Sequence, residues 1–184
     1  FGTTGEYGEW KPIQYGGAYG TNGFYLPFKQ DYSVQGFSTT VYTGNGVTGR
    51  YVGGAGFSPD LTWIARRDGS DNKVIFNSVV GHDKQIKTNA ADAEDDNNRV
   101  SRKTDGIQID TTDGNLNADG GQYVVWNWDM GGSNANNTTG GIDSVVRANT
   151  AYGQSIVTYT GTGSAATVGH GLGIAPKCIF VKNR

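Results

Sequence analysis

Apolar and polar residues alternate with a period of two along most of this chain, the pattern of half-buried β-strands. Glycine and proline turns, such as Gly44-Asn45-Gly46 and Ser58-Pro59-Asp60, separate the alternating runs. The pattern therefore predicts an all-β fold, an antiparallel β-sandwich of the jelly-roll type. The expected strands are 37–42, 61–65, 73–80, 86–88, 106–110 and 122–130.

The run Gln122–Met130 is the strongest strand signal. Tyr123 and Val125 would share one face, and Trp126 and Trp128 the other, so apolar side chains on both faces predict a central strand. We expect Trp63, Trp126 and Trp128 to be core residues, because each buries a large apolar area. Local capping signals predict one helical turn within 90–100, with Asp92 as its N-cap.

The chain contains an internal repeat. A shift of 117 residues places Gly36–Arg67 on Gly153–Arg184 without a gap, and ten of the 32 positions are identical. The shared positions include Tyr-Thr-Gly-x-Gly, a proline and the final arginine. A repeat of this length indicates a protein built from structural units that stack on their neighbours.

The repeat divides the chain into three parts. Residues 1–35 form a lead-in rich in glycine and aromatic residues, 36–152 form one complete sandwich module, and 153–184 are the first strands of a second, truncated repeat. Strands of a partial repeat lack their own partners. We therefore expect residues 153–184 to lean on the first module or to pair with another chain.

Composition narrows the class of protein. The 30 glycines in 184 residues are about twice the usual ~7% share, and they fit many tight turns. A net charge of −2 provides no electrostatic footprint for nucleic acid. No apolar stretch approaches the ~20 residues needed to span a bilayer. A single cysteine, Cys178, excludes an intramolecular disulfide and favours folding in a reducing cytoplasm.

Four segments resemble a known group of proteins: Gly20–Phe28, Gly36–Gly46, Tyr123–Gly132 and Val168–Arg184. They are similar to repeat modules of large virion proteins of marine tailed bacteriophages, the tail fibre and structural proteins. The module resembles concanavalin A-like, laminin-G-like sandwiches. One departure is that Gly53-Gly54-Ala55 stands where the second copy has His170-Gly171-Leu172.

The resemblance implies a non-enzymatic structural and adhesive module of a phage virion, in a tail fibre or appendage that acts outside the cell and contacts the host surface. Its partners would be copies of itself, with a homotrimer as one arrangement, other virion proteins and host surface glycans. Neither nucleic acid nor membrane insertion is expected. The alternatives are a capsid decoration or surface-filament lattice protein, and a carbohydrate-binding module or glycan depolymerase domain.

Two sets of residues are candidate binding sites. Aromatic rings stack on the apolar faces of sugars, and the most available in the sequence are Trp10, Tyr15, Tyr19 and Tyr25. Calcium takes six to eight oxygen ligands. Its candidate ligands are Asp92, Asp95, Asp96 and Asn97, with a second set at Asp68, Asp71 and Asn72. Three converging carboxylates from the first set would instead suit a glycan depolymerase.

The remaining chemistry-bearing residues favour structural roles. His82 and His170 follow or enter glycine turns, with no serine or cysteine nucleophile in an elbow beside them. Turn and capping roles are expected for both. Cys178 occupies the position of Leu61 in the repeat and alternates with Ile179, so we expect a small buried hydrophobic residue.

Overall fold

A computed structural model describes residues 2–4, 10–12, 16–17, 21 and 35–184. The chain divides into two compact units, Phe1–Tyr32 and Ser33–Arg184. In the first unit, β1 (Gly2–Thr4) pairs antiparallel with β2 (Trp10–Pro12). The described residues contain strands and turns but no helix, and accordingly none long and apolar enough to cross a membrane. The all-β prediction is therefore confirmed.

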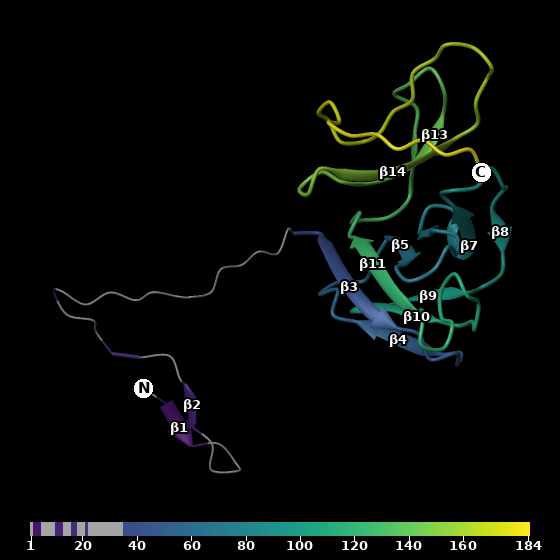
Figure 1. The fold of residues 1–184 in the computed structure, drawn as a ribbon. Helices are drawn as coiled ribbons and strands as arrows, with labels where there is room; N and C mark the ends of the chain where they lie inside the picture. Colours follow the sequence, from purple (N-terminus) through teal and green to yellow (C-terminus); the bar gives the residue numbers. More distant parts are fainter. Residues whose placement is uncertain (1, 5–9, 13–15, 18–20, 22–34) are drawn as a thin grey trace. The chain divides into compact units, whose positions relative to one another are not determined.

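The larger sheet of the second unit has six antiparallel strands in the order β3-β11-β5-β6-β7-β8 (Figure 1). Because β11 lies between β3 and β5, the predicted central strand is confirmed. The strands are β3 (Phe37–Thr43), β5 (Leu61–Arg66), β6 (Val74–Asn77), β7 (Gly81–Lys87), β8 (Asp95–Asp96) and β11 (Gln122–Trp128).

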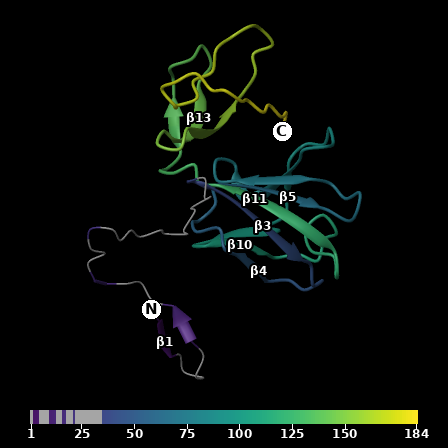
Figure 2. The same ribbon diagram turned by 60° about the vertical axis from the view of Figure 1, so that its left-hand side comes forward.

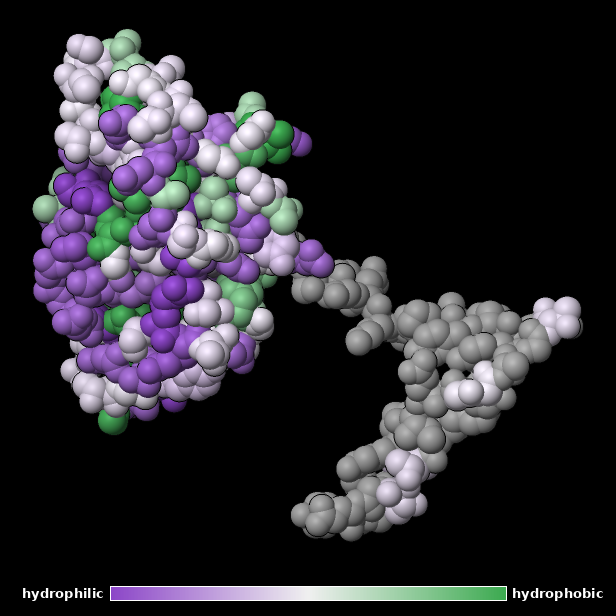
Figure 3. Space-filling view, turned by 180° about the vertical axis from the view of Figure 1, so that it is seen from behind, coloured by the Kyte–Doolittle hydropathy of each residue, from purple (hydrophilic) through white to green (hydrophobic). Residues whose placement is uncertain are grey.

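A second, smaller sheet lies across the first as a separate layer (Figure 2). Its antiparallel order is β4-β10-β9, formed by β4 (Arg50–Gly53), β9 (Val100–Lys103) and β10 (Gly106–Ile109). Both sheets send buried apolar side chains into one shared core, so the arrangement is that of a β-sandwich. The surface seen from behind is largely hydrophilic, with apolar residues in small separate groups (Figure 3).

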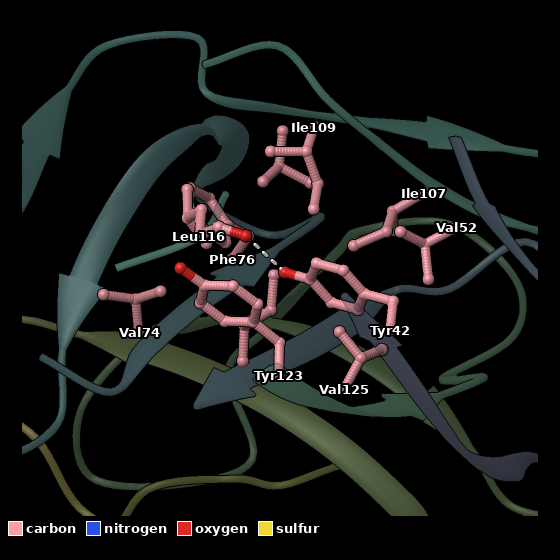
Figure 4. Packing of buried hydrophobic residues seen from close by; sticks show 11 residues of the cluster. Tyr42, Val52, Val74, Phe76, Ile107, Ile109, Leu116, Tyr123 and Val125 are labelled. Atoms are coloured by element: carbon pink, nitrogen blue, oxygen red, sulfur yellow. Dashed lines mark hydrogen bonds between the residues drawn. The ribbon is translucent and has the colours of Figure 1, made fainter. Parts of the chain in front are cut away.

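The core is centred on two tyrosines (Figure 4). The rings of Tyr42 in β3 and Tyr123 in β11 stack with centroids 4.9 Å apart. Both hydroxyls find partners, since Tyr42 donates to the Leu116 carbonyl at 2.6 Å and Tyr123 donates to the Gly114 carbonyl at 2.7 Å. Burial, followed by the neighbouring Tyr123, raises the pKa of Tyr42. These bonds hold the 114–118 loop against the core.

A third sheet, β12-β13-β14, follows the sandwich in the chain. It contains β12 (Ala135–Asn137), β13 (Ser144–Asn149) and β14 (Gln154–Tyr159). The repeat boundary at 152/153 falls in the turn between β13 and β14, which pair along their full lengths. Part of 153–184 therefore attaches to strand residues that precede the boundary, as the sequence leads us to expect.

Glycine conformation shows that the repeat is structural as well as sequential. Four pairs of equivalent glycines have a positive φ in both copies, a region that side chains with a Cβ rarely occupy. The pairs are Gly36/Gly153 (73° and 67°), Gly46/Gly163 (62° and 75°), Gly54/Gly171 (89° and 74°) and Gly56/Gly173 (79° and 73°).

Two local expectations are wrong. The segment 90–100 forms no helical turn; instead, Asp95 and Asp96 pair with Gln85 and Lys84 as the edge strand β8, so cross-strand pairing outweighs the local capping signal. The three tryptophans of β5 and β11 are not core residues either. They point away from the shared core on the outer face of the six-stranded sheet and are partly exposed.

Candidate functional site

Asp60 is the most highly connected buried charge in the described part of the chain. It lies immediately before β5, where Pro59 ends the preceding turn, and only 1% of its surface is exposed. Its backbone is fixed on both sides, because its N–H donates to Trp128 O and its carbonyl accepts from Ser78 N, each at 2.8 Å. The carboxylate is therefore locked between β11 and the end of β6.

The Asp60 carboxylate receives four polar partners. Oδ1 faces Arg102 at 2.8 Å and Arg147 at 3.1 Å, and accepts a bond from the Ser78 hydroxyl at 2.9 Å. Oδ2 accepts from the backbone N–H of Met130 at 3.0 Å. A buried carboxylate tolerates desolvation when its charge is paired and its lone pairs are satisfied, and this arrangement meets both conditions.

The two arginines come from different sheets. Arg102 belongs to β9 of the smaller sandwich sheet, and Arg147 belongs to β13 of the third sheet. Arg147 also donates to Gly131 O at 3.1 Å and Gly132 O at 2.7 Å. One carboxylate thus connects all three sheets and fixes the segment that leads from the sandwich into β12.

His82 in β7 borders this cluster, a position different from the turn role expected from the sequence. Its Nε2 is buried without a partner. Burial, followed by the positive charges of Arg102 and Arg147, lowers the pKa of His82 from 6.5 to about 3. The imidazole is therefore neutral at physiological pH and a poor general base.

The outer face of the six-stranded sheet carries an aromatic strip, which we define as Phe37, Trp63, Trp126 and Trp128. These side chains sit on aligned rungs, since Trp128 is opposite Phe37 and Trp126 is opposite Trp63. The Phe37 and Trp128 rings are 5.1 Å apart and tilted, and those of Trp63 and Trp126 are 5.8 Å apart and edge-on. Cross-strand aromatic pairs of this kind stabilise a sheet.

The aromatic strip is an apolar surface in partial contact with solvent. Val41, on the same face, is 61% exposed, and Phe180 reaches Trp63 edge-on at 6.3 Å between ring centroids. Apolar patches that remain on a folded surface mark sites of interaction. This strip is therefore a candidate contact surface. Sequence alternation placed Trp126 and Trp128 on one face, but the three tryptophans were expected in the core.

The aspartates among the proposed calcium ligands are each engaged by a cation. Asp92 pairs with Lys87, Asp96 with Lys84, and Asp95 with Arg99 at 3.7 Å. Hydrogen bonding to Lys87 lowers the pKa of Asp92. In the second set, Asp68 and Asp71 both pair with Arg66, at 2.8 and 2.9 Å. Among residues that the structure describes, no three or more His, Cys, Asp or Glu side chains cluster to hold a metal.

Asn97 differs from its neighbours, because both polar atoms of its side chain are buried without a partner. Each of the three carboxylates near it pairs with a different cation, whereas glycoside hydrolysis requires a pair of carboxyl groups that flank one bond of the substrate. Calcium binding here stays a prediction.

The expected sugar platform lies largely outside the described residues. Trp10 in β2 is 67% exposed, whereas Tyr15, Tyr19 and Tyr25 all fall on positions that the structure does not describe. A sugar site in the lead-in therefore stays a prediction.

The remaining two candidate residues lie in the second copy. His170 has the expected turn role, since its Nδ1 accepts the Leu172 N–H at 3.2 Å. Cys178 is exposed rather than buried. Its segment forms no strand, so the neighbour that would cover the thiol is missing, and the expectation of a buried residue is wrong.

Comparison with known proteins gives one match. The model of a family described as a domain of unknown function (DUF7483) matches residues 32–184, which is most of the chain and includes all three sheets of the second unit. No curated protein and no solved structure matches the chain.

We predict that Asp60→Asn lowers the free energy of unfolding by about 3 kcal/mol, the low end for breaking a buried ion pair. The low end applies because the Arg102 and Arg147 side chains are 30% and 15% exposed and regain some hydration. Urea denaturation measures the loss. The control, Asp96→Asn, removes an exposed partner of Lys84 and should cost less than about 1 kcal/mol. Equal losses in the two variants would contradict the role of Asp60.

His82 should make stability depend on pH. Its folded pKa of about 3 is below its ordinary 6.5, so the unfolded chain binds the extra proton between these values. The contribution of the neutral His82 to the free energy of unfolding is complete above about pH 6.5. It is lost as the pH falls toward 3, by at most ~1.4 kcal/mol per pH unit. Unfolding free energies at pH 7, 6 and 5 should decline less steeply in His82→Gln. Parallel declines would show that His82 does not titrate in this way.

Proposed function

This chain belongs to the DUF7483 family, and we propose that it is a non-enzymatic structural and adhesive module of a tailed-bacteriophage virion. The observation that carries the proposal is the sheet β12-β13-β14, which continues across the repeat boundary at 152/153. Strand pairing across a boundary joins consecutive repeats by backbone hydrogen bonds. Flexible linkers would leave the repeats free to reorient.

The Asp60–Arg147 pair supports the same conclusion. It attaches β13 to the sandwich through a buried carboxylate, so the third sheet is bound to its preceding module by side chains as well as by the chain itself. Repeats joined in this way form a stiff, quasi-one-dimensional array. We propose a tail fibre or appendage as its place in the virion, and a jelly-roll, concanavalin A-like topology for each sandwich.

Adhesion would use many weak contacts. In an array of repeats, weak contacts lie one after another along the fibre, and effective concentration multiplies the affinity of the individual contacts. The low charge of the chain, −2 in 184 residues, permits copies to pack side by side. A capsid decoration protein or a surface-filament lattice protein would also need stiffly joined repeats. The location of the protein on the particle distinguishes these alternatives from a tail fibre.

Antibody fragments against this chain test the assignment on particles of a tailed phage that encodes it. Gold-labelled fragments should bind a tail appendage in electron micrographs, and unlabelled fragments should slow adsorption to host cells. Fragments against the major capsid protein serve as the control and should leave adsorption unchanged. Label confined to the capsid would instead support a decoration protein, and particles without label would contradict a virion role.

Carbohydrate binding is a second candidate function, favoured by the partly exposed aromatic strip. Flat indole rings such as Trp126 stack on pyranose faces, and a shallow sheet face suits an extended glycan. The full chain should bind host-envelope glycans on an array, and Trp126→Ala should weaken binding at least about tenfold, the equivalent of ~1.4 kcal/mol. Tyr51→Ala, which removes a 52% exposed ring from the other sheet, is the matched control. Absence of binding by the unaltered chain would reject this candidate.

A further inference from the structure

The second copy reproduces the opening strands of the first module in space. β14 corresponds to β3 by the 117-residue shift. Of the four shared left-handed glycine pairs, one lies just before these strands and three set the same turns after them. Residues 153–173 are therefore the start of a second sandwich.

The segment equivalent to the opposite layer lies beside the third sheet, although it forms no strand. In the first module β3 and β4 belong to opposite sheets, and residues 167–170 correspond to β4. These residues lie against the third sheet, since Val168 bridges Ile142 and a Cβ on Gly171 would be 2.9 Å from a Val146 methyl. Val146 is opposite Val157, so both point to the face that 167–171 covers.

The equivalent of the core tyrosine points to that same face but lacks its partner. Tyr42 is 9% exposed and stacks on Tyr123, which lies directly opposite it in β11. Its counterpart Tyr159 is 48% exposed. A hollow of about 400 Å³ lies at this end of the sheet and is lined by residues of both its faces, Ser144, Val145, Thr158 and Tyr159 among them.

β14 also has an edge that no described strand occupies, because it ends its sheet. In β3 the even-numbered residues direct their backbone N–H and C=O groups toward β11. At the two ends of the ladder, the Gly44 N–H donates to the Gly121 carbonyl and the Gly36 carbonyl accepts from the Asp129 N–H. Antiparallel strands alternate in this respect. The shift carries these positions to Ser155, Val157 and Tyr159 of β14.

We propose that the open edge of β14 is an acceptor for one extended strand with the chemistry of Gln122–Trp128. The strand would run antiparallel to β14 in the β3–β11 register, with its tyrosine on Tyr159 and its apolar residues on both faces. The other edge of the added strand would pair with residues 178–183, which correspond to β5. Within this segment Ile179, Phe180 and Val181 are 70–84% exposed. Strand addition of this kind is an established mode of recognition and does not depend on a location in a virion.

A synthetic peptide with the sequence of Gln122–Asp129 tests the proposal against the full chain. Amide exchange, followed residue by residue by NMR, should slow at Ser155, Val157 and Tyr159 by at least about tenfold. By the same alternation the amides of Ile156 and Thr158 would point toward β13 and should change little. The control peptide carries proline at the position of Val125, which removes a donor and blocks the ladder without altering the chain.

The outcomes are distinct. Protection by the first peptide but not by the proline peptide supports the acceptor edge. Protection of Ser155, Val157 and Tyr159 in the chain alone, together with a dimer in solution, would show that a second copy occupies the edge and overturn the proposal. Peptide binding that leaves β14 exchange unchanged would also overturn it.

Discussion

The arrangement of the three sheets depends on the ion pairs and hydrogen bonds of the Asp60 carboxylate. A carboxylate that is 1% exposed loses nearly all of its hydration, and only well-placed charges and donors can compensate for that loss. Arg102 and Arg147 supply the charges from separate sheets, and Ser78 and the Met130 amide supply further bonds. The sheets must therefore keep one relative position, because any other would leave a buried charge unpaired.

This constraint also sets the direction in which the chain leaves the sandwich. The sandwich ends at β11, and Arg147 fixes the following segment through Gly131 and Gly132, so β13 leaves the sandwich at a set angle. β14 then pairs with β13 and begins the next repeat. Lys177 stands at the position of Asp60 in the second copy. The repeats thus share strands and turns but differ in the charge that holds their layers together.

Much of this architecture follows from local pattern, and the remainder depends on distant contacts. Alternation around Tyr123 and Val125 predicted a central strand, and the repeat predicted β14. Alternation groups Trp126 with Trp128 but does not say which face of a sheet is covered, so these rings were wrongly expected in the core. Asp60 gave no signal beyond its turn, because Arg102 and Arg147 are far away in the sequence. Cys178 looked like a strand residue but lacks the neighbouring strand.

Native-state hydrogen exchange in increasing urea tests most directly whether Asp60 unites the sheets. If Asp60 couples them, the slowest amides of β11 and β13 should open with the same free energy and the same urea dependence, as parts of one cooperative unit. Arg147→Gln should then separate the two, lowering the opening free energy of β13 while β11 changes less. Opening of β13 far below β11 in the unaltered chain would contradict the account.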